Sequence, residues 1–286
     1  MTKDMRHVGV LGFGTMGAGI VQLVAQSGRE VTVLETDQAR IDAGFAFMRQ
    51  FLDGGVARGK VTEAGRDEIL DHVRGVTDVS ALATAEIVIE AVTERREIKR
   101  ELLSLVAEAA GPDALIVTNT SALSVTDLAT AVTRPERFAG LHFFNPAPLM
   151  KVIEVVRALR TDEAVIEQLV GFVSALGKDP VVVKDRPGFL VNRLLIPYLN
   201  DVVQAYDDEL ASAGDIDTAI RLGLGHKQGP LELIDMIGLD VHEHATTRAY
   251  EATLDPAFAP PPLLRHMVAA GLLGNKSGGG FRTEGH

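Results

Sequence analysis

Residues 7–17 read HVGVLGFGTMG, and this stretch decides the fold. Its first five residues have a strand-like composition, and Gly12, Gly14 and Gly17 follow in the spacing G-x-G-x-x-G. A helical pattern then runs to Gln26, and a second β-rich run occupies residues 31–34. In this context Gly12 permits a tight turn, Gly14 lets a pyrophosphate approach the backbone, and Gly17 allows close packing of helix and strand. The stretch therefore predicts a dinucleotide-binding βαβ unit rather than a glycine-rich turn without a ligand.

The predicted cofactor is NAD. The start of the helix, at Thr15 and Met16, would present N–H groups and a partial positive charge to the phosphates. Glu35 ends the second β-rich run, 35 − 17 = 18 residues after Gly17. An acid at this place binds the ribose hydroxyls and repels the 2′-phosphate of NADP. Asp37 is close enough to compete for the role, but Glu35 is favoured because it directly closes the apolar run.

Outward from this unit, short β-rich runs alternate with helical patterns up to about residue 186. Such alternation predicts an α/β fold with a Rossmann-like, doubly wound, mostly parallel sheet and helices on both faces. The expected further strands are residues 87–89, 115–117, 138–141, 152–157 and 181–183, and the expected helices are 39–54, 63–73, 97–110 and 162–176.

No good strand pattern follows residues 185–188, which read DRPG. The chain instead shows helical spacing over 189–210 and 231–250, and a short helix with Asp215 as its N-cap that ends at Gly223. Residues 260–262, all proline, then break the chain before a helix that reaches Gly271. We therefore expect a dinucleotide-binding domain of residues 1–186 and an all-helical domain of residues 187–286 for substrate binding and dimerisation.

Composition excludes several classes of function. The 286 residues carry 28 Lys and Arg against 39 Asp and Glu, a net charge of −11, which disfavours binding to nucleic acid or an anionic membrane. Cysteine is absent, so disulfides, thiolate metal sites and cysteine nucleophiles are excluded, and we expect no metal. The N-terminus shows no signal-peptide pattern and no stretch reaches the ~18 apolar residues of a membrane span, so we expect a soluble cytoplasmic protein.

A second informative segment, residues 140–146, reads GLHFFNP. It places His142 at the carboxyl end of an expected strand, where open α/β sheets bind ligands. Glu154 follows in a β-like run that could return beside it, and a carboxylate there would fix the imidazole tautomer and stabilise the imidazolium. Such a pair alone is more often structural than catalytic.

Two further polar residues are candidates for the same site. Ser121 follows another strand and could reach the same crevice, although its segment could also cap a helix. Asn192 opens the helical domain.

Together these segments resemble the L-3-hydroxyacyl-CoA dehydrogenase family, of the 3-hydroxybutyryl-CoA type. The resemblance covers almost the whole chain. It rests on several motifs in order: residues 12–20, 89–92, 119–121, 140–146, 187–195, 229–240 and 274–281.

The resemblance implies a role for each matching residue. His142 would be the general base and Glu154 would orient it, while Ser121 and Asn192 would bind the substrate oxygen. Other residues would contact the cofactor or the CoA: Asn145, Glu94 and Lys99 on the nicotinamide side, Lys276 in the tail, and Arg58 and Lys60 near the CoA nucleotide. The family also implies a homodimer and closure between the domains.

One departure leaves the acyl carrier open. Phe51 stands where the family tends to carry a Ser that reaches CoA. The sequence therefore predicts NAD-dependent oxidation of a hydroxyacyl thioester on CoA, with an acyl carrier protein as the alternative handle, for example for a glyceryl unit. A non-catalytic, crystallin-like protein is the alternative from another class, and a sugar-acid dehydrogenase of related fold is a weaker one.

Overall fold

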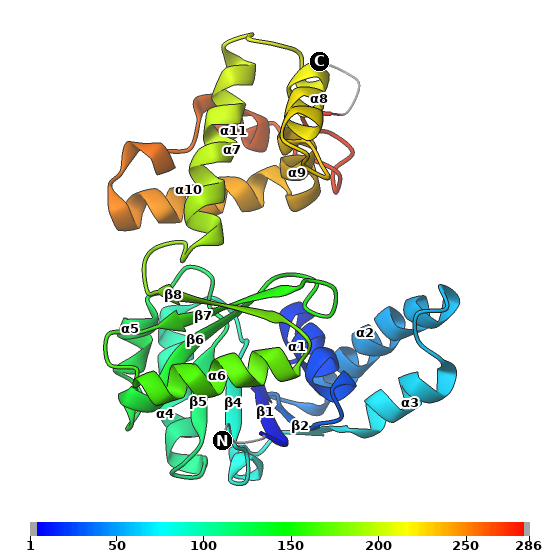
Figure 1. Ribbon diagram of the computed structural model, residues 1–286, viewed down its shortest axis with the longest axis vertical. Helices are drawn as coiled ribbons and strands as arrows, with labels where there is room; N and C mark the ends of the chain where they lie inside the picture. Colours follow the sequence, from blue (N-terminus) through cyan, green and yellow to red (C-terminus); the bar gives the residue numbers. More distant parts are fainter. Residues whose placement is uncertain (1–4, 283–286) are drawn as a thin grey trace. The chain divides into compact units, whose positions relative to one another are not determined.

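The computed structural model describes residues 5–282 and divides the chain into two compact units, one up to Arg186 and one from Pro187. The first unit is built on an eight-stranded sheet in the order β3-β2-β1-β4-β5-β6-β7-β8 (Figure 1). Its strands are β1 (His7–Leu11), β2 (Glu30–Leu34), β3 (Val73–Val76), β4 (Ile87–Glu90), β5 (Leu115–Thr118), β6 (Phe138–Phe143), β7 (Val152–Arg157) and β8 (Asp179–Lys184).

Six helices connect these strands. They are α1 (Thr15–Gln26), α2 (Gln38–Ala57), α3 (Glu63–Asp71), α4 (Arg96–Ala109), α5 (Val125–Ala129) and α6 (Glu163–Ala175). Helix α1 ends where the sequence predicts, because Ser27 caps it and Gly28 takes a positive φ of 75°. Helices α2 and α3 form a hairpin that extends away from the sheet (Figure 1).

The strand directions bring the carboxyl ends of several strands to one edge of the sheet. Strands β1 to β6 pair in parallel, and the order reverses between β1 and β4. Strand β7 pairs antiparallel with β6, and β8 pairs parallel with β7. The carboxyl ends of β1, β4, β5 and β6 therefore lie along the edge where doubly wound sheets bind ligands. The expected Rossmann-like, mostly parallel sheet is confirmed.

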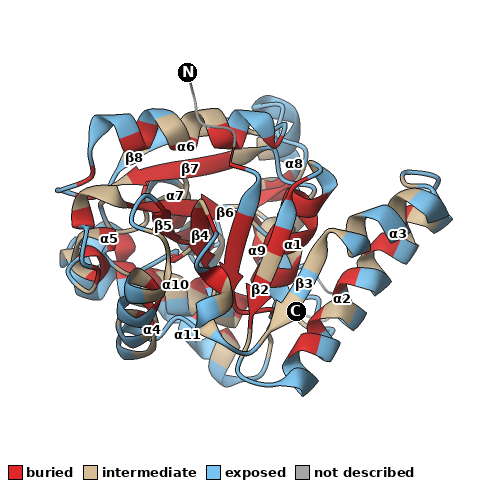
Figure 2. Cartoon of the chain, turned by 90° about the horizontal axis from the view of Figure 1, so that it is seen from below, coloured by how far each residue is buried: buried red, intermediate tan, exposed pale blue. Residues whose placement is uncertain are grey.

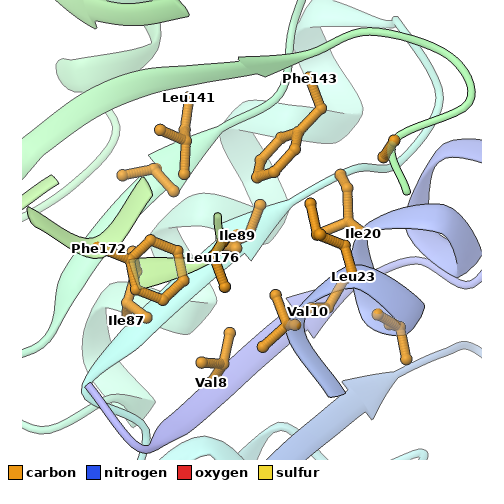
Figure 3. Close-up of a cluster of buried hydrophobic side chains, with 14 of the residues drawn as sticks. Val8, Val10, Ile20, Leu23, Ile87, Ile89, Leu141, Phe143, Phe172 and Leu176 are labelled. Carbon is orange, nitrogen blue, oxygen red and sulfur yellow. The ribbon is translucent and has the colours of Figure 1, made fainter. Parts of the chain in front are cut away.

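The core explains why these strands read as nearly continuous apolar runs. Ile20 and Leu23 of α1, with Phe172 and Leu176 at α6, pack onto strand side chains such as Ile89 (Figure 3). Figure 2 shows that the residues of the central strands are buried, whereas most residues of α2 and α3 are exposed or intermediate. A sheet covered by helices on both faces buries both sides of each central strand.

The second unit is helical within its described residues. Its helices are α7 (Val191–Asp207), α8 (Ala213–Gly223), α9 (Pro230–Ile237), α10 (Leu239–Thr253) and α11 (Pro262–Ala269), with a short 3₁₀ turn at Pro256–Phe258. Leu199, Val203, Leu231, Ile234 and Leu264 form much of its core. The expected helical second domain is confirmed as a fold class.

Three details of the sequence interpretation were wrong. Strand β3 occupies residues 73–76, where the expected helix 63–73 ends and no strand was expected. Helix α8 is capped by Ser212, whose hydroxyl accepts from the Asp215 N–H, so Asp215 lies in the first turn rather than at the N-cap. The single helix expected over 231–250 is two helices, because Gly238 adopts a φ of 103° between them.

Candidate active site

The glycine turn after β1 has the geometry that a pyrophosphate requires. Gly12 takes a φ of 93°, and its N–H donates to the Leu34 carbonyl at 2.9 Å. A Cβ on Gly17 would lie 2.0 Å from the Gly12 oxygen, so only glycine fits there. A Cβ on Gly14 would meet nothing within 4 Å, which leaves room beside the backbone. Helix α1 starts at Thr15 without a side-chain cap, so its first N–H groups point toward this space.

Glu35 and Asp37 have different partners. The Glu35 carboxylate accepts from the Phe13 N–H, in the middle of the glycine turn, at 2.7 Å, and from the Thr36 N–H at 3.0 Å. Asp37 is the N-cap of α2 and accepts from the Arg40 N–H at 2.9 Å. This bond is the largest cause that lowers the pKa of Asp37. Glu35 therefore lies at the glycine turn, whereas Asp37 is used as a helix cap.

His142 and Glu154 are brought together by strand register. They are directly opposite in the antiparallel pair of β6 and β7, and His142 Nδ1 lies 2.7 Å from Glu154 Oε2. Their side chains are 7% and 1% exposed. The Phe144 ring lies 4.5 Å from the imidazole, centroid to centroid. A buried carboxylate at this distance holds the Nδ1–H tautomer, so Nε2 is the nitrogen that can accept a proton.

The segment after β5 carries Ser121 at the neighbouring strand end. Ser121 is exposed, and its N–H donates to Glu94 Oε1 at 3.0 Å. Helix α5 is capped by Ser124 rather than by Ser121. The Asn119 side chain accepts from the Phe143 N–H at 2.9 Å, which ties this segment to the strand that carries His142.

Glu94 and Lys99 form an ion pair with a third, unexpected partner. Lys99 is 1% exposed, and its ammonium lies 3.1 Å from Glu94 Oε2 and 2.6 Å from Glu90 Oε1. Burial would raise the pKa of Glu94, but the Lys99 charge and hydrogen bonds from Thr120 and Ser121 outweigh it and lower the pKa. Glu94 is therefore an ionised carboxylate beside Ser121.

Other predicted residues of the first unit lie at different places. Asn145 is exposed just after β6 and is joined to Pro146 by a cis peptide bond. Arg58 caps the end of α2, and Lys60 follows it in the connection to α3, both exposed. Because α2 has 20 residues and each residue rises ~1.5 Å, these two cations lie roughly 30 Å along the helix from its start beside β2.

Two predicted residues belong to the second unit, and their roles stay predictions. Asn192 lies in the first turn of α7. Lys276 lies in the tail segment, where its ammonium donates to Asp240 at 2.6 Å. This hydrogen bond is the largest cause that lowers the pKa of Asp240. Asp235 holds the same tail by accepting from the N–H groups of Phe281 and Arg282.

Two kinds of feature are not found among the described residues. Among residues 5–282, no cluster of three or more His, Cys, Asp and Glu could hold a metal ion. Within that same range, no helix is both long and apolar enough to cross a membrane.

Comparison with known proteins decides the family. Residues 7–186 match the 3-hydroxyacyl-CoA dehydrogenase NAD binding domain, and residues 188–284 match the C-terminal domain of the same family. The chain belongs to the 3-hydroxyacyl-CoA dehydrogenase family. It is an NAD-dependent oxidoreductase, and the glycine turn, the uncapped start of α1 and Glu35 fit NAD.

Individual relatives of this family match over the full length. The chain is 42% identical to a 3-hydroxybutyryl-CoA dehydrogenase of Mycobacterium tuberculosis, over 99% of this chain and 100% of that protein. It is 39% identical to the mitochondrial hydroxyacyl-coenzyme A dehydrogenase of Sus scrofa, over 97% of this chain and 90% of that protein. The solved structure of (S)-3-hydroxybutyryl-CoA dehydrogenase from Ralstonia eutropha superposes with a TM-score of 0.93 at 38% identity, covering 99% of this chain and 100% of that one.

The sequence alone predicts no role for several residues of this site. Side chains at the ends of β4 and β5 make hydrogen bonds that connect these segments. They belong to Glu90, Thr118, Asn119 and Thr120. One signal is present in the sequence: Glu90 directly follows the apolar run of residues 87–89, and a carboxylate in a buried strand requires a partner. The partner, Lys99, lies nine residues later on α4.

Proposed function

We propose that this protein oxidises a short-chain 3-hydroxyacyl-CoA to the 3-oxoacyl-CoA with NAD⁺, and catalyses the reverse reduction. The observation that carries the proposal is the buried His142–Glu154 pair, with Nδ1 and Oε2 2.7 Å apart, at the ligand-binding edge of an NAD-binding sheet. The names of the full-length relatives support this choice of substrate. We also propose that the reaction takes place in the cytoplasm.

The chemistry divides between cofactor and protein. When bound, NAD⁺ accepts the hydride that leaves C3 of the substrate. His142 takes the hydroxyl proton at Nε2 while its Nδ1–H donates to Glu154, whose charge stabilises the resulting imidazolium. The family resemblance implies that Ser121 and Asn192 hold the substrate oxygen. In the reverse direction the imidazolium returns the proton to that oxygen.

A direct assay tests this proposal. The purified protein, acetoacetyl-CoA and NADH should lose NADH absorbance in a protein-dependent way, and 3-hydroxybutyryl-CoA with NAD⁺ should give the reverse change. Absence of turnover with CoA thioesters of several chain lengths, in a folded protein that still binds NADH, would instead favour the non-catalytic, crystallin-like alternative.

One observation favours a second candidate, the same reaction on an acyl carrier protein. Phe51 replaces the expected hydroxyl on α2, and the nearby cations are Arg58, Lys60 and Arg49. A lost hydrogen bond costs ~1 kcal/mol, about fivefold in affinity, which is too little to abolish use of CoA. We therefore retain CoA as the first candidate. The test compares kcat/KM for one acyl group on both carriers, and a preference above ~100-fold for the carrier protein, more than ~2.7 kcal/mol, would reverse the choice.

A further inference from the structure

A cavity of about 310 Å³ lies in the first unit, at the edge of the sheet opposite the candidate active site. Its walls come from the end of α4, from residues 110–114 ahead of β5 and from residues 132–137 ahead of β6. Strands β5 and β6 are parallel, so both begin at this edge. From Phe138 to His142, β6 covers ~13 Å at ~3.3 Å per residue. A molecule in this cavity therefore lies apart from the imidazole and the glycine turn.

The walls of the cavity are largely apolar. The apolar side chains that line it include Ala107, Ala110, Ala114, Ile116 and Val132. Ile116 and Val132 are each only 8% exposed, although both border the cavity. Binding sites for small molecules typically combine such walls with a few polar groups that fix the orientation of the ligand.

Two arginines supply positive charge to the lining. Arg134 Nη1 donates to the Pro112 carbonyl, and Arg137 Nη2 donates to the Asp113 carbonyl. Arg134 also pairs with Glu136, with Nε and Oε1 3.4 Å apart. These contacts hold two long side chains in place before any ligand arrives, which lowers the entropic cost of binding.

Arg137 is the cation of this cavity that lacks a counter-charge. Within residues 5–282 no carboxylate pairs with it, and its buried Nε–H has no hydrogen-bond acceptor. Burial without an acceptor is unfavourable for a donor, and more so for a charged one. Glu108, the acidic residue of the lining, is exposed and pairs with neither arginine. An anionic acceptor supplied by a ligand would therefore satisfy Arg137.

We propose that this cavity is a binding site for a small carboxylate with a short apolar body, separate from the sites for NAD and the thioester. The carboxylate pairs with the Arg137 guanidinium through charge-assisted hydrogen bonds, and Arg134 adds positive charge beside it. The apolar body lies against the alanine, isoleucine and valine side chains of the walls. These walls favour such a molecule over inorganic phosphate, which has no apolar part to bury.

Isothermal titration calorimetry with 4-phenylbutyrate tests the proposal. The wild-type protein should bind it with a Kd on the order of 1 mM, as expected for about twelve non-hydrogen atoms. The uncharged 4-phenylbutanamide has the same size and should bind at least ~10-fold more weakly. Saturating 4-phenylbutyrate should change the Kd of NADH by less than ~2-fold, because the two sites lie at opposite edges of the sheet.

Matched variants locate the site. Arg137→Met should weaken binding of 4-phenylbutyrate at least ~10-fold. Arg74→Met removes an exposed arginine from β3, at the far end of the sheet, and should leave the Kd within ~2-fold of wild type. If Arg137→Met does not fold, Ala107→Phe replaces it, because it fills part of the cavity from α4 and keeps both arginines. It should also weaken binding at least ~10-fold.

Four results would overturn the proposal. The first is no binding of 4-phenylbutyrate by the wild-type protein up to ~10 mM. The second is equal affinity for 4-phenylbutanamide, and the third is unchanged affinity in Arg137→Met or in the cavity-filling variant. The fourth is competition with NADH or acetoacetyl-CoA, which would place the carboxylate in the active site instead.

Discussion

At the scale of single residues, two His–Glu pairs within residues 5–282 differ in burial. His142 Nδ1 lies 2.7 Å from Glu154, and His72 Nδ1 lies 2.8 Å from Glu30. The second pair is at the surface, with side chains 26% and 58% exposed, against 7% and 1% for the first. Exposed pairs contribute little because water screens them, whereas a buried carboxylate acts strongly on its imidazole.

The His72–Glu30 pair therefore provides a matched control for catalysis. His142→Gln should lower kcat by ~10²-fold or more, the usual contribution of a general base, and should leave NADH binding intact. Glu154→Gln should also lower kcat, because the imidazolium loses its counter-charge. His72→Gln should leave kcat unchanged. Steady-state kinetics and NADH titration measure these effects, and normal turnover by His142→Gln would exclude the mechanism.

Cofactor choice is a second prediction at this scale. Glu35 accepts from the Phe13 N–H at the glycine turn, so we expect its charge to lie where a 2′-phosphate would have to bind. We expect a higher kcat/KM with NAD⁺ than with NADP⁺, and a smaller ratio in Glu35→Ala. Asp37→Asn, at the α2 cap, should leave the ratio unchanged. Measuring both cofactors at equal concentration tests this, and a wild-type preference for NADP⁺ would remove the role of Glu35.

At the scale of secondary-structure elements, a buried polar network joins α7, α10 and the 3₁₀ turn. His242 Nε2 donates to Asn200 Oδ1 at 3.1 Å, Asn200 donates to the Thr246 hydroxyl at 2.7 Å, and Thr246 donates to the Phe258 carbonyl at 2.7 Å. Burial lowers the pKa of His242 to about 4, from an ordinary value of 6.5. The folded second unit therefore holds this imidazole neutral.

This network predicts acid sensitivity. Between about pH 6.5 and about pH 4 the unfolded chain binds a proton at His242 that the folded chain does not. The free energy of unfolding should therefore fall as the pH falls through this window, with a slope of up to ~1.4 kcal/mol per pH unit.

Denaturation curves at several pH values test the contribution of His242. His242→Gln keeps a donor for Asn200 but cannot titrate, so its stability should depend less on pH than that of the wild type. His244→Gln, an exposed residue of the same helix, should keep the wild-type dependence. Equal pH slopes in wild type and His242→Gln would contradict the prediction.

The elements that the sequence predicted well are those with strong local signals. Residues 7–34 combine apolar runs with a glycine turn, and the observed β1, α1 and β2 follow that pattern. Strand β3 gave no such signal, because it is four residues long and contains Arg74 and Gly75. Gly75 is explained only by tertiary packing, since a Cβ there would lie 2.3 Å from Ile41.

The site was predictable where function depends on strand ends, and less so where it depends on side-chain direction. The β-like run around Glu154 predicts a strand that returns beside His142, and the observed register places the two residues opposite each other. The sequence could not show that Lys99 points inward to Glu90, because both interior and surface lysines occur on amphipathic helices. It also could not separate Glu35 from Asp37 by spacing alone.

At the scale of the whole molecule, the second unit exposes large apolar side chains that its own core does not bury. An apolar groove of about 440 Å³ lies between α7 and α8, lined by residues that include Val202, Leu210, Ile216 and Ile220. Leu210 is 77% exposed, and Leu222 and Leu224 are 73% and 65% exposed. Exposed apolar surface of this kind is typical of subunit interfaces, so we predict a homodimer through residues 187–286.

Light scattering at micromolar concentration should give twice the chain mass. Leu210→Asp would place a charge in the predicted interface and should shift the equilibrium toward monomer. Leu159→Asp changes an equally exposed leucine of the first unit, 82% exposed, and should leave the mass unchanged. A monomeric wild type would refute the dimer, and a dimer insensitive to Leu210→Asp would exclude the groove as its interface.

The antiparallel pairing of β6 with β7 determines which changes in chain length this enzyme could tolerate. His142 and Glu154 meet because they are opposite in the ladder, and strand residues alternate between the two faces of a sheet. Extra residues within 144–151 would lengthen only the connection and preserve that alignment. A single residue inserted within β7 ahead of Glu154 would turn its carboxylate to the opposite face and separate it from the imidazole. The spacing within the two strands is therefore constrained by the His142–Glu154 pairing, whereas the length of the connection beyond Asn145 is not.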